Sequence, residues 1–213
     1  MSQIVLTADT LSTATAGAFE YDGRVAYVTP QGTQRGVVLG AQFFRLNSDY
    51  AGTTATTAQG IFGIGTSGVG VGVTLSSSTI YAFESVYVLS KTATATSHNI
   101  SVSFGGTATI NNILYVVLAG GLNQLALPVL NDGLQYSSIN TTSASNIAPS
   151  ITTTNRIQTV RYTGTVSIGT GGTFIPQYTT SAAVGPYSTT AGSYFLIYPL
   201  SISGSNTSVG AWA

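Results

Sequence analysis

The sequence predicts an all-β protein: an antiparallel β-sandwich or jelly roll with an N-terminal extended arm and a hairpin. Short runs that alternate between apolar and polar residues recur along the chain, as they do in half-buried strands. Glycine-containing turn dipeptides separate these runs, and the one candidate helical segment, residues 53–62, is weakened by Gly60. Many short strands joined by glycine-rich turns are typical of sandwiches and jelly rolls.

The alternating runs predict the strands in chain order. The longest is residues 79–90 (TIYAFESVYVLS), where Tyr81, Phe83, Tyr87 and Leu89 share one face and Glu84 lies on the other with isoleucine and valine. Because both faces are largely apolar, we expect this strand to be central in its sheet and covered on both sides. The other predicted strands are residues 24–29, 42–46, 99–104, 107–118, 156–168, 173–178 and 193–202.

The charged residues divide the chain into two parts. The sequence has six basic and six acidic residues in 213, far below the roughly one quarter of charged residues in soluble domains. Seven of these twelve lie in the first 50 residues. We therefore assign residues 1–50 to an N-terminal arm and β-hairpin, and residues 51–213 to a jelly-roll-like sandwich. The Ser/Thr/Asn-rich residues 136–154 are expected to form a long surface loop.

Composition excludes several function classes. The net charge is zero and the basic residues are scattered, so we expect no nucleic-acid partner. No apolar stretch approaches the ~20 residues of a membrane helix, and the start MSQIVLTADTLST does not resemble a signal peptide. One histidine and no cysteine cannot assemble a standard zinc site, so we expect neither metal nor cofactor. His98 is expected in a loop, with a structural role or exposed to solvent.

Two sets of acids are candidate sites. Glu20 and Asp22 would share one face of a strand, as the paired carboxylates of a glycosidase must share one cleft. Asp22-Gly23 is also a hairpin signal and Arg24 is at hand to neutralise either acid, which favours a structural role. Glu84 lies among apolar residues and needs a cation, for which Arg161 is the first candidate and Arg156 the second. We interpret that pair as an ion pair in the core or at a subunit interface.

Three tracts resemble modules of tailed-bacteriophage virion proteins. Residues 16–38 (AGAFEYDGRVAYVTPQGTQRGVV) contain an EYDG hairpin followed by TP and RG. Residues 160–178 (VRYTGTVSIGTGGTFIPQY) contain GT-x-x-PQ, and the closing SYFLIYPLSISGSNTSVGAWA contains YF-x-x-x-P and S-x-G-x-W. The Y-x-F-E of residues 81–84 fits the same group. The resemblance implies a β-sandwich trimer in a virion fibre, appendage or capsid-associated protein, and it offers no catalytic residues.

This resemblance leads to an expected function without catalysis. We expect a homotrimeric capsid decoration (cement) protein, made in the host cytoplasm and bound on the outer surface of the particle to the major capsid protein or another virion protein. The alternative is a short tail fibre that binds host-surface glycan through exposed Tyr136, Tyr178 or Tyr187. A third hypothesis is a glycan hydrolase built on Glu20 and Asp22. The residues assigned to the attachment hairpin are Glu20, Asp22, Arg24 and Arg35, and Trp212 is assigned as a C-terminal anchor.

Overall fold

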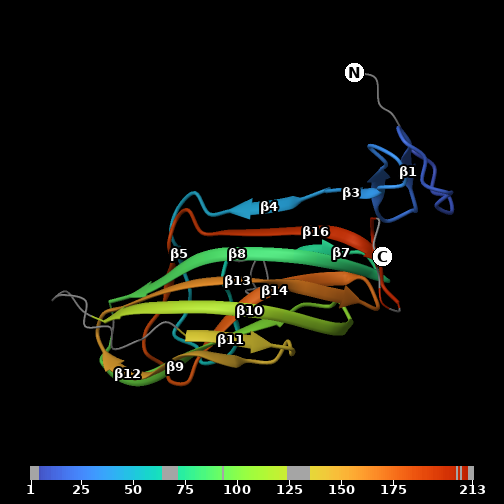
Figure 1. The fold of residues 1–213 in the computed structure, drawn as a ribbon. Coiled ribbons are helices and arrows are strands. Elements are labelled where there is room, and N and C mark those ends of the chain that lie inside the picture. Colours follow the sequence, from blue (N-terminus) through green and yellow to red (C-terminus); the bar gives the residue numbers. More distant parts are fainter. Residues whose placement is uncertain are drawn as a thin grey trace.

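The structure is a computed structural model that describes residues 5–63, 72–92, 94–123, 135–204, 206 and 208–210. All regular elements in this part of the chain are β-strands, and every strand pairing is antiparallel. The predicted all-β antiparallel sandwich is thereby confirmed. Figure 1 shows a sandwich of two sheets with a smaller unit beyond one edge.

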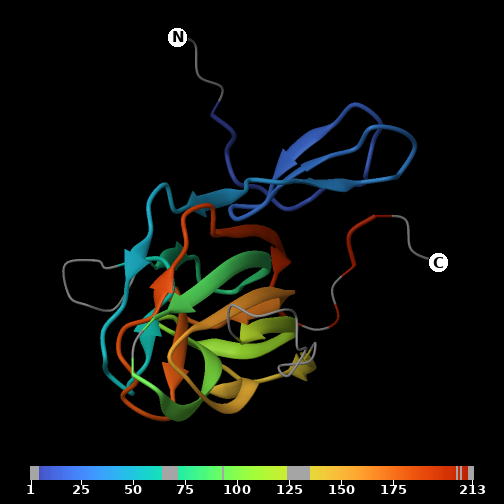
Figure 2. The same cartoon turned by 90° about the vertical axis from the view of Figure 1, so that its left-hand side faces the viewer.

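The smaller unit is a three-stranded sheet in the order β1-β2-β3. We call residues 5–38 the N-terminal module. Its buried side chains are Val25, Tyr27 and Thr29, which form a small core separate from that of the sandwich. The module projects from the β4 side of the sandwich in both views (Figures 1 and 2). Its strands are β1 (Phe19–Tyr21), β2 (Ala26–Val28) and β3 (Gly36–Val38).

The larger sheet of the sandwich has eight strands, with β8 (Thr79–Lys91) at its centre. Strands β13, β10 and β11 follow on one side of β8, and β16 and β4 follow on the other, with β15 and β5 beside its C-terminal end. These strands are β4 (Gln42–Arg45), β5 (Tyr50–Ala51), β10 (Ile110–Asn123), β11 (Gln135–Ile139), β13 (Arg156–Ile168), β15 (Ser188–Thr189) and β16 (Tyr194–Ile202).

The smaller sheet of the sandwich has the order β12-β9-β14-β6, and β7 also pairs with β14. It consists of β6 (Gln59–Gly60), β7 (Val73–Leu75), β9 (Thr96–Gly105), β12 (Ser145–Thr153) and β14 (Gly172–Thr180). β9 pairs with β12 along one edge and with β14 along the other. The inner face of this sheet covers the inner face of the larger one.

Aromatic rings fill the space between the two sheets. Phe83 of β8 contacts rings from β9, β10, β13, β14 and β16, with centroid distances of 5.3 to 6.2 Å. Phe104 and Phe174 stack at 4.5 Å with an interplanar angle of 8°. Because side chains alternate along a strand, Tyr81, Phe83, Tyr87 and Leu89 all face this core, as the sequence pattern predicts.

Three sequence-based expectations differ from the structure. Residues 136–154 are not one loop, because they contain most of β11 and all of β12. Strand β4 lies within the predicted arm and β5 begins at its last residue, but both pair with strands of the larger sheet. The second face of β8 is not covered within the chain: Ile80, Val86 and Val88 are only partly buried.

Candidate functional site

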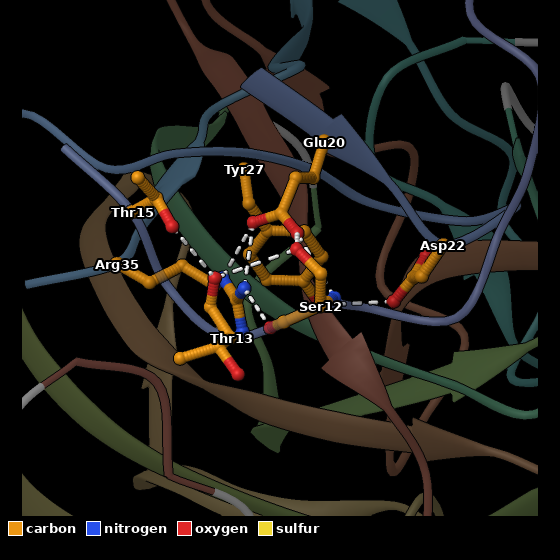
Figure 3. Close-up of polar contacts among 7 residues, drawn as sticks. All are labelled: Ser12, Thr13, Thr15, Glu20, Asp22, Tyr27 and Arg35. Carbon is orange, nitrogen blue, oxygen red and sulfur yellow. Dashed lines mark hydrogen bonds and ion pairs between the residues drawn. The ribbon is translucent and has the colours of Figure 1, made fainter. Parts of the chain in front are cut away.

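A polar cluster holds the N-terminal module together (Figure 3). Glu20 of β1 accepts hydrogen bonds from the Ser12 hydroxyl at 2.8 Å and from Arg35 Nε at 2.8 Å. Arg35 Nη2 lies 2.7 Å from Glu20 Oε2 and also donates to the Ser12 carbonyl. The hydrogen bond from Ser12, together with those from Arg35, lowers the pKa of the Glu20 carboxyl. The ionised Glu20 of β1 therefore connects the segment around Ser12 with the segment around Arg35.

Asp22 organises the turn between β1 and β2. Its Oδ1 accepts the backbone N–H groups of Arg24 at 2.8 Å and Val25 at 2.7 Å, and its Oδ2 accepts the Tyr27 hydroxyl at 3.0 Å. Gly23 follows with a φ of 91°, in the left-handed region that favours glycine. Burial, with a contribution from Asp22, raises the pKa of Tyr27. Asp22 thus acts as a turn cap whose three acceptor contacts lie within the module.

The geometry of Glu20 and Asp22 does not suit acid–base catalysis. A glycosidase needs one carboxyl that stays protonated near neutral pH and a second that faces the same substrate. The pKa of Glu20 is instead lowered, and both carboxylates are engaged by groups of their own module. The cation beside Glu20 is Arg35 and not Arg24, whose buried Nε has no hydrogen-bond partner among the described residues.

Glu84 and Arg161 meet on the outer face of the larger sheet. Arg161 Nη2 lies 3.5 Å from Glu84 Oε2, and the two side chains are 58% and 32% exposed respectively. The Tyr194 hydroxyl of β16 donates to Glu84 Oε1 at 2.6 Å, which raises the pKa of Tyr194. The pair therefore lies at the surface of the chain and not in the core. Arg156, the second candidate partner, faces the opposite side of the sheet.

The face that carries this pair is rich in exposed apolar side chains. Of the ten large hydrophobic side chains that are exposed in the described residues, five lie on it. They come from four strands other than β8: Phe43 (60% exposed), Leu114 (54%), Leu118 (38%), Tyr136 (71%) and Ile157 (42%). We call this surface, which spans β4, β16, β8, β13, β10 and β11, the outer apolar face. An exposed patch of this extent is typical of an interaction surface.

The corresponding outer face of the smaller sheet is polar. It presents serine, threonine and asparagine from β9, β12 and β14, and none of the ten exposed hydrophobic side chains lies on it. The Ser97 and Ser150 hydroxyls lie 3.0 Å apart across β9 and β12. The members are Ser97, Asn99, Ser101, Asn146, Ser150, Thr152 and Thr179.

A buried polar cluster at one end of the sandwich is not expected from the sequence. His98 lies on β9 and is fully buried, so the expected loop position is wrong. Its Nε2 lies 2.6 Å from the Tyr187 hydroxyl, and Nδ1 lies 2.8 Å from the Thr96 carbonyl oxygen. Arg156 donates to the carbonyls of His98 and Pro149. These groups satisfy backbone carbonyls where strands end, which is a structural role.

Tyr178 and Tyr187 belong to the same interior. Each is 1% exposed, whereas the proposed glycan contacts require exposed rings. The Tyr178 hydroxyl donates to Gln59 Oε1 at 3.3 Å. Of the three aromatic residues suggested for glycan stacking, Tyr136 is the exposed one.

The C-terminal segment lies against the N-terminal module. Ser208, Val209 and Gly210 line a groove of about 450 Å³ together with module residues that include Tyr27 and Arg35. Trp212, assigned as the C-terminal anchor, lies outside the described residues.

A second pocket opens between the two sheets. It has a volume of about 270 Å³ and is lined mainly by apolar side chains, among them Phe43, Phe44, Phe62 and Phe195. A selective ligand site normally adds several convergent polar groups to an apolar lining. This lining has Gln42 and Thr74 as its polar side chains, which favours a packing imperfection over a ligand site.

Within the described residues, no three His, Cys, Asp or Glu side chains lie close enough to hold a metal ion. The same part of the chain has no helix that is long and apolar enough to cross a membrane. No protein-family model, no curated protein and no solved structure matches the chain.

Proposed function

We propose that this chain is a non-enzymatic structural protein of a tailed-bacteriophage virion, and that it acts as a trimeric decoration protein on the outer surface of the head. The resemblance of residues 16–38 and 160–178 to virion modules is the starting point. The antiparallel sandwich is compatible with that resemblance. The partners of this function are other copies of the chain and the major capsid protein or a neighbouring virion protein.

The observation that carries the proposal is the structural separation of the N-terminal module from the sandwich. The module has its own sheet and its own small core, and it lies outside the sandwich (Figure 2). A protein that stabilises a lattice needs a rigid body and a separate element that reaches an adjacent subunit. The module supplies such an element, and Glu20, Asp22, Arg24 and Arg35 shape it.

The acids favour a structural role over hydrolysis of glycan. Glu20 and Asp22 each stabilise the conformation of the module, so neither is available as a proton donor or a nucleophile. Loss of an activity in Asp22→Asn would be the minimum support for a hydrolase.

The exposure of Tyr136 is the one observation that favours the alternative, a short tail fibre that binds host-surface glycan. Aromatic rings commonly supply the apolar contact of a binding site. The burial of Tyr178 and Tyr187 removes the other two suggested contacts, so we prefer the decoration protein.

Copy number separates these two functions. Quantitative mass spectrometry of purified virions would measure this chain against the major capsid protein. A decoration protein is expected at a ratio near that of the capsid protein, in hundreds of copies. A ratio of a few per cent would contradict the head location and support the tail fibre, and absence from the particle would overturn both.

The attachment role of the module has its own test. Deleting residues 1–20 removes Ser12 and Glu20 together with most of β1, so binding to particles that lack the protein should be lost. Deleting residues 1–7 is the matched control, because these residues precede Asp9, whose backbone N–H bonds to the Tyr21 carbonyl. Unchanged binding after the longer deletion would contradict attachment through the module.

A further inference from the structure

The outer apolar face is a continuous surface with a regular arrangement of side chains. The strand pairings align Arg45, Tyr194, Val86, Arg161, Leu118 and Tyr136 in one row across six strands. The next row consists of Phe43, Leu196, Glu84, Thr163, Val116 and Ser138. Because alternate residues of each strand share a face, these rows stand side by side on the outside of the sandwich.

The area of this face approaches what a stable protein interface needs. Strands lie about 4.8 Å apart and alternate residues about 6.7 Å apart, so each outward residue covers about 32 Å². The outward residues of the six strands, two on each of β4 and β11 and more on the four between them, cover roughly 700 Å². A stable interface buries about 800 Å² on each partner. The face is therefore large enough to supply most of one side of such an interface.

The charges on this face favour a partner of the same sequence. Glu84 of β8 and Arg161 of β13 lie side by side near the middle of the face. Arg45 lies on β4, two strands from β8. A second copy can bring its own Arg161 toward Glu84, so the two copies meet with opposite charges adjacent. Around the pair, the hydroxyls of Thr159, Thr163 and Thr165 are exposed and can donate or accept.

We infer that the outer apolar face is the surface through which copies of this chain associate. The inference deepens the proposed function and rests on its oligomeric part, because it names the surface that the copies share. Association would remove water from Val86, Val116 and Leu118 and leave the polar outer face of the smaller sheet exposed.

A matched pair of substitutions tests the inference. Leu114 is 54% exposed on the outer apolar face, and Leu39 is 57% exposed in the segment between β3 and β4. Sedimentation of the full chain over a concentration series should show an assembly for the wild type. Leu114→Asp should raise the dissociation constant at least ~10-fold, since it places a charge on the apolar surface that the copies would bury. Leu39→Asp should sediment as the wild type does.

Several results would overturn the inference: a wild type that is monomeric throughout the series, a Leu114→Asp variant that assembles normally, or equal dissociation of both variants. Far-UV circular dichroism checks that each variant keeps its β-structure.

A second measurement avoids placing a charge such as that of Leu114→Asp on this face. The chain has no cysteine, so Thr163→Cys and Thr152→Cys each create a single labelling site, on the outer apolar face and on the polar outer face respectively. Nitroxide labels should show stronger intermolecular dipolar coupling at position 163 than at position 152, because position 163 would lie in the interface and position 152 on the far face. The reverse pattern would overturn the inference.

The two proposals can fail separately. A dimer would support the inference and contradict the trimer of the proposed function. Absence of the chain from virions would contradict the proposed function and leave the self-association measurement unaffected.

Discussion

The sandwich buries a continuous cluster of aromatic rings, whereas the N-terminal module buries three side chains and joins its segments through hydrogen bonds to two carboxylates. The first kind of stabilisation follows apolar area and responds little to pH or salt. The second depends on the ionisation of Glu20 and on the hydrogen-bond geometry around Glu20 and Asp22. Because the module buries few side chains, we expect it to be less stable than the sandwich and more sensitive to pH.

The largest effect should come from the aromatic core of the sandwich. Phe83 is 1% exposed and contacts five aromatic rings. Phe83→Ala should lower the free energy of unfolding by about 3–5 kcal/mol, through lost burial and the cavity that remains. Chemical denaturation followed by circular dichroism measures this change.

The control for Phe83 is the exposed Phe19, which is 52% accessible on β1. Phe19→Ala should change the free energy of unfolding of the sandwich by less than about 0.5 kcal/mol. Equal losses in the two variants would contradict the account in which Phe83 is a core residue and Phe19 a surface residue.

An intermediate effect should distinguish two buried tyrosines. The Tyr27 hydroxyl donates to the Asp22 carboxylate in the module. The Tyr87 hydroxyl is buried in the sandwich and has no hydrogen-bond partner among the described residues. Tyr27→Phe should cost the module about 1.5–3 kcal/mol, as expected for a hydrogen bond to a charged group. Tyr87→Phe should cost nothing or stabilise the sandwich, because it removes a desolvated polar group.

Hydrogen exchange of backbone amides reports the two regions separately and is the measurement for this pair. Faster exchange in β1 to β3 for Tyr27→Phe, with unchanged exchange in β8 and β13, is the expected pattern. A Tyr87→Phe variant that is less stable than the wild type would contradict the account of the sandwich core.

The sequence predicts well those strands whose apolar and polar residues alternate because one face is buried and the other is exposed. Residues 156–168 are predicted as a strand, and β13 has those bounds because its inner side chains face the core and its outer ones face solvent. Strand β12 is missed because its sequence, SNIAPSITT, is rich in hydroxyls and contains Pro149. It lies at an edge of its sheet, where proline is tolerated, and its register shifts twice against β9.

The partners of the polar residues depend on contacts that are distant in sequence. Arg24 is close to Glu20 along the chain, but pairing of β2 with both β1 and β3 brings Arg35 to Glu20 instead. His98 meets Tyr187, which is 89 residues away, and this contact explains why a residue expected in a loop is fully buried. A local pattern carries no information about such pairs, because it does not specify which strands are neighbours.

The smallest effect should be the response of the module to acid. The pKa of Glu20 is lowered in the folded protein, so its contribution to stability is present above the unfolded pKa of about 4.3 and is lost as the pH falls through the folded pKa. Amide protection factors in β1 to β3 should therefore decrease below about pH 4, while those of the sandwich core stay level. Glu20→Gln cannot ionise and should remove this step at Glu20. If the module of the wild type is equally protected on both sides of this pH, or if Glu20→Gln keeps the full step, the ionised Glu20 does not hold the module together.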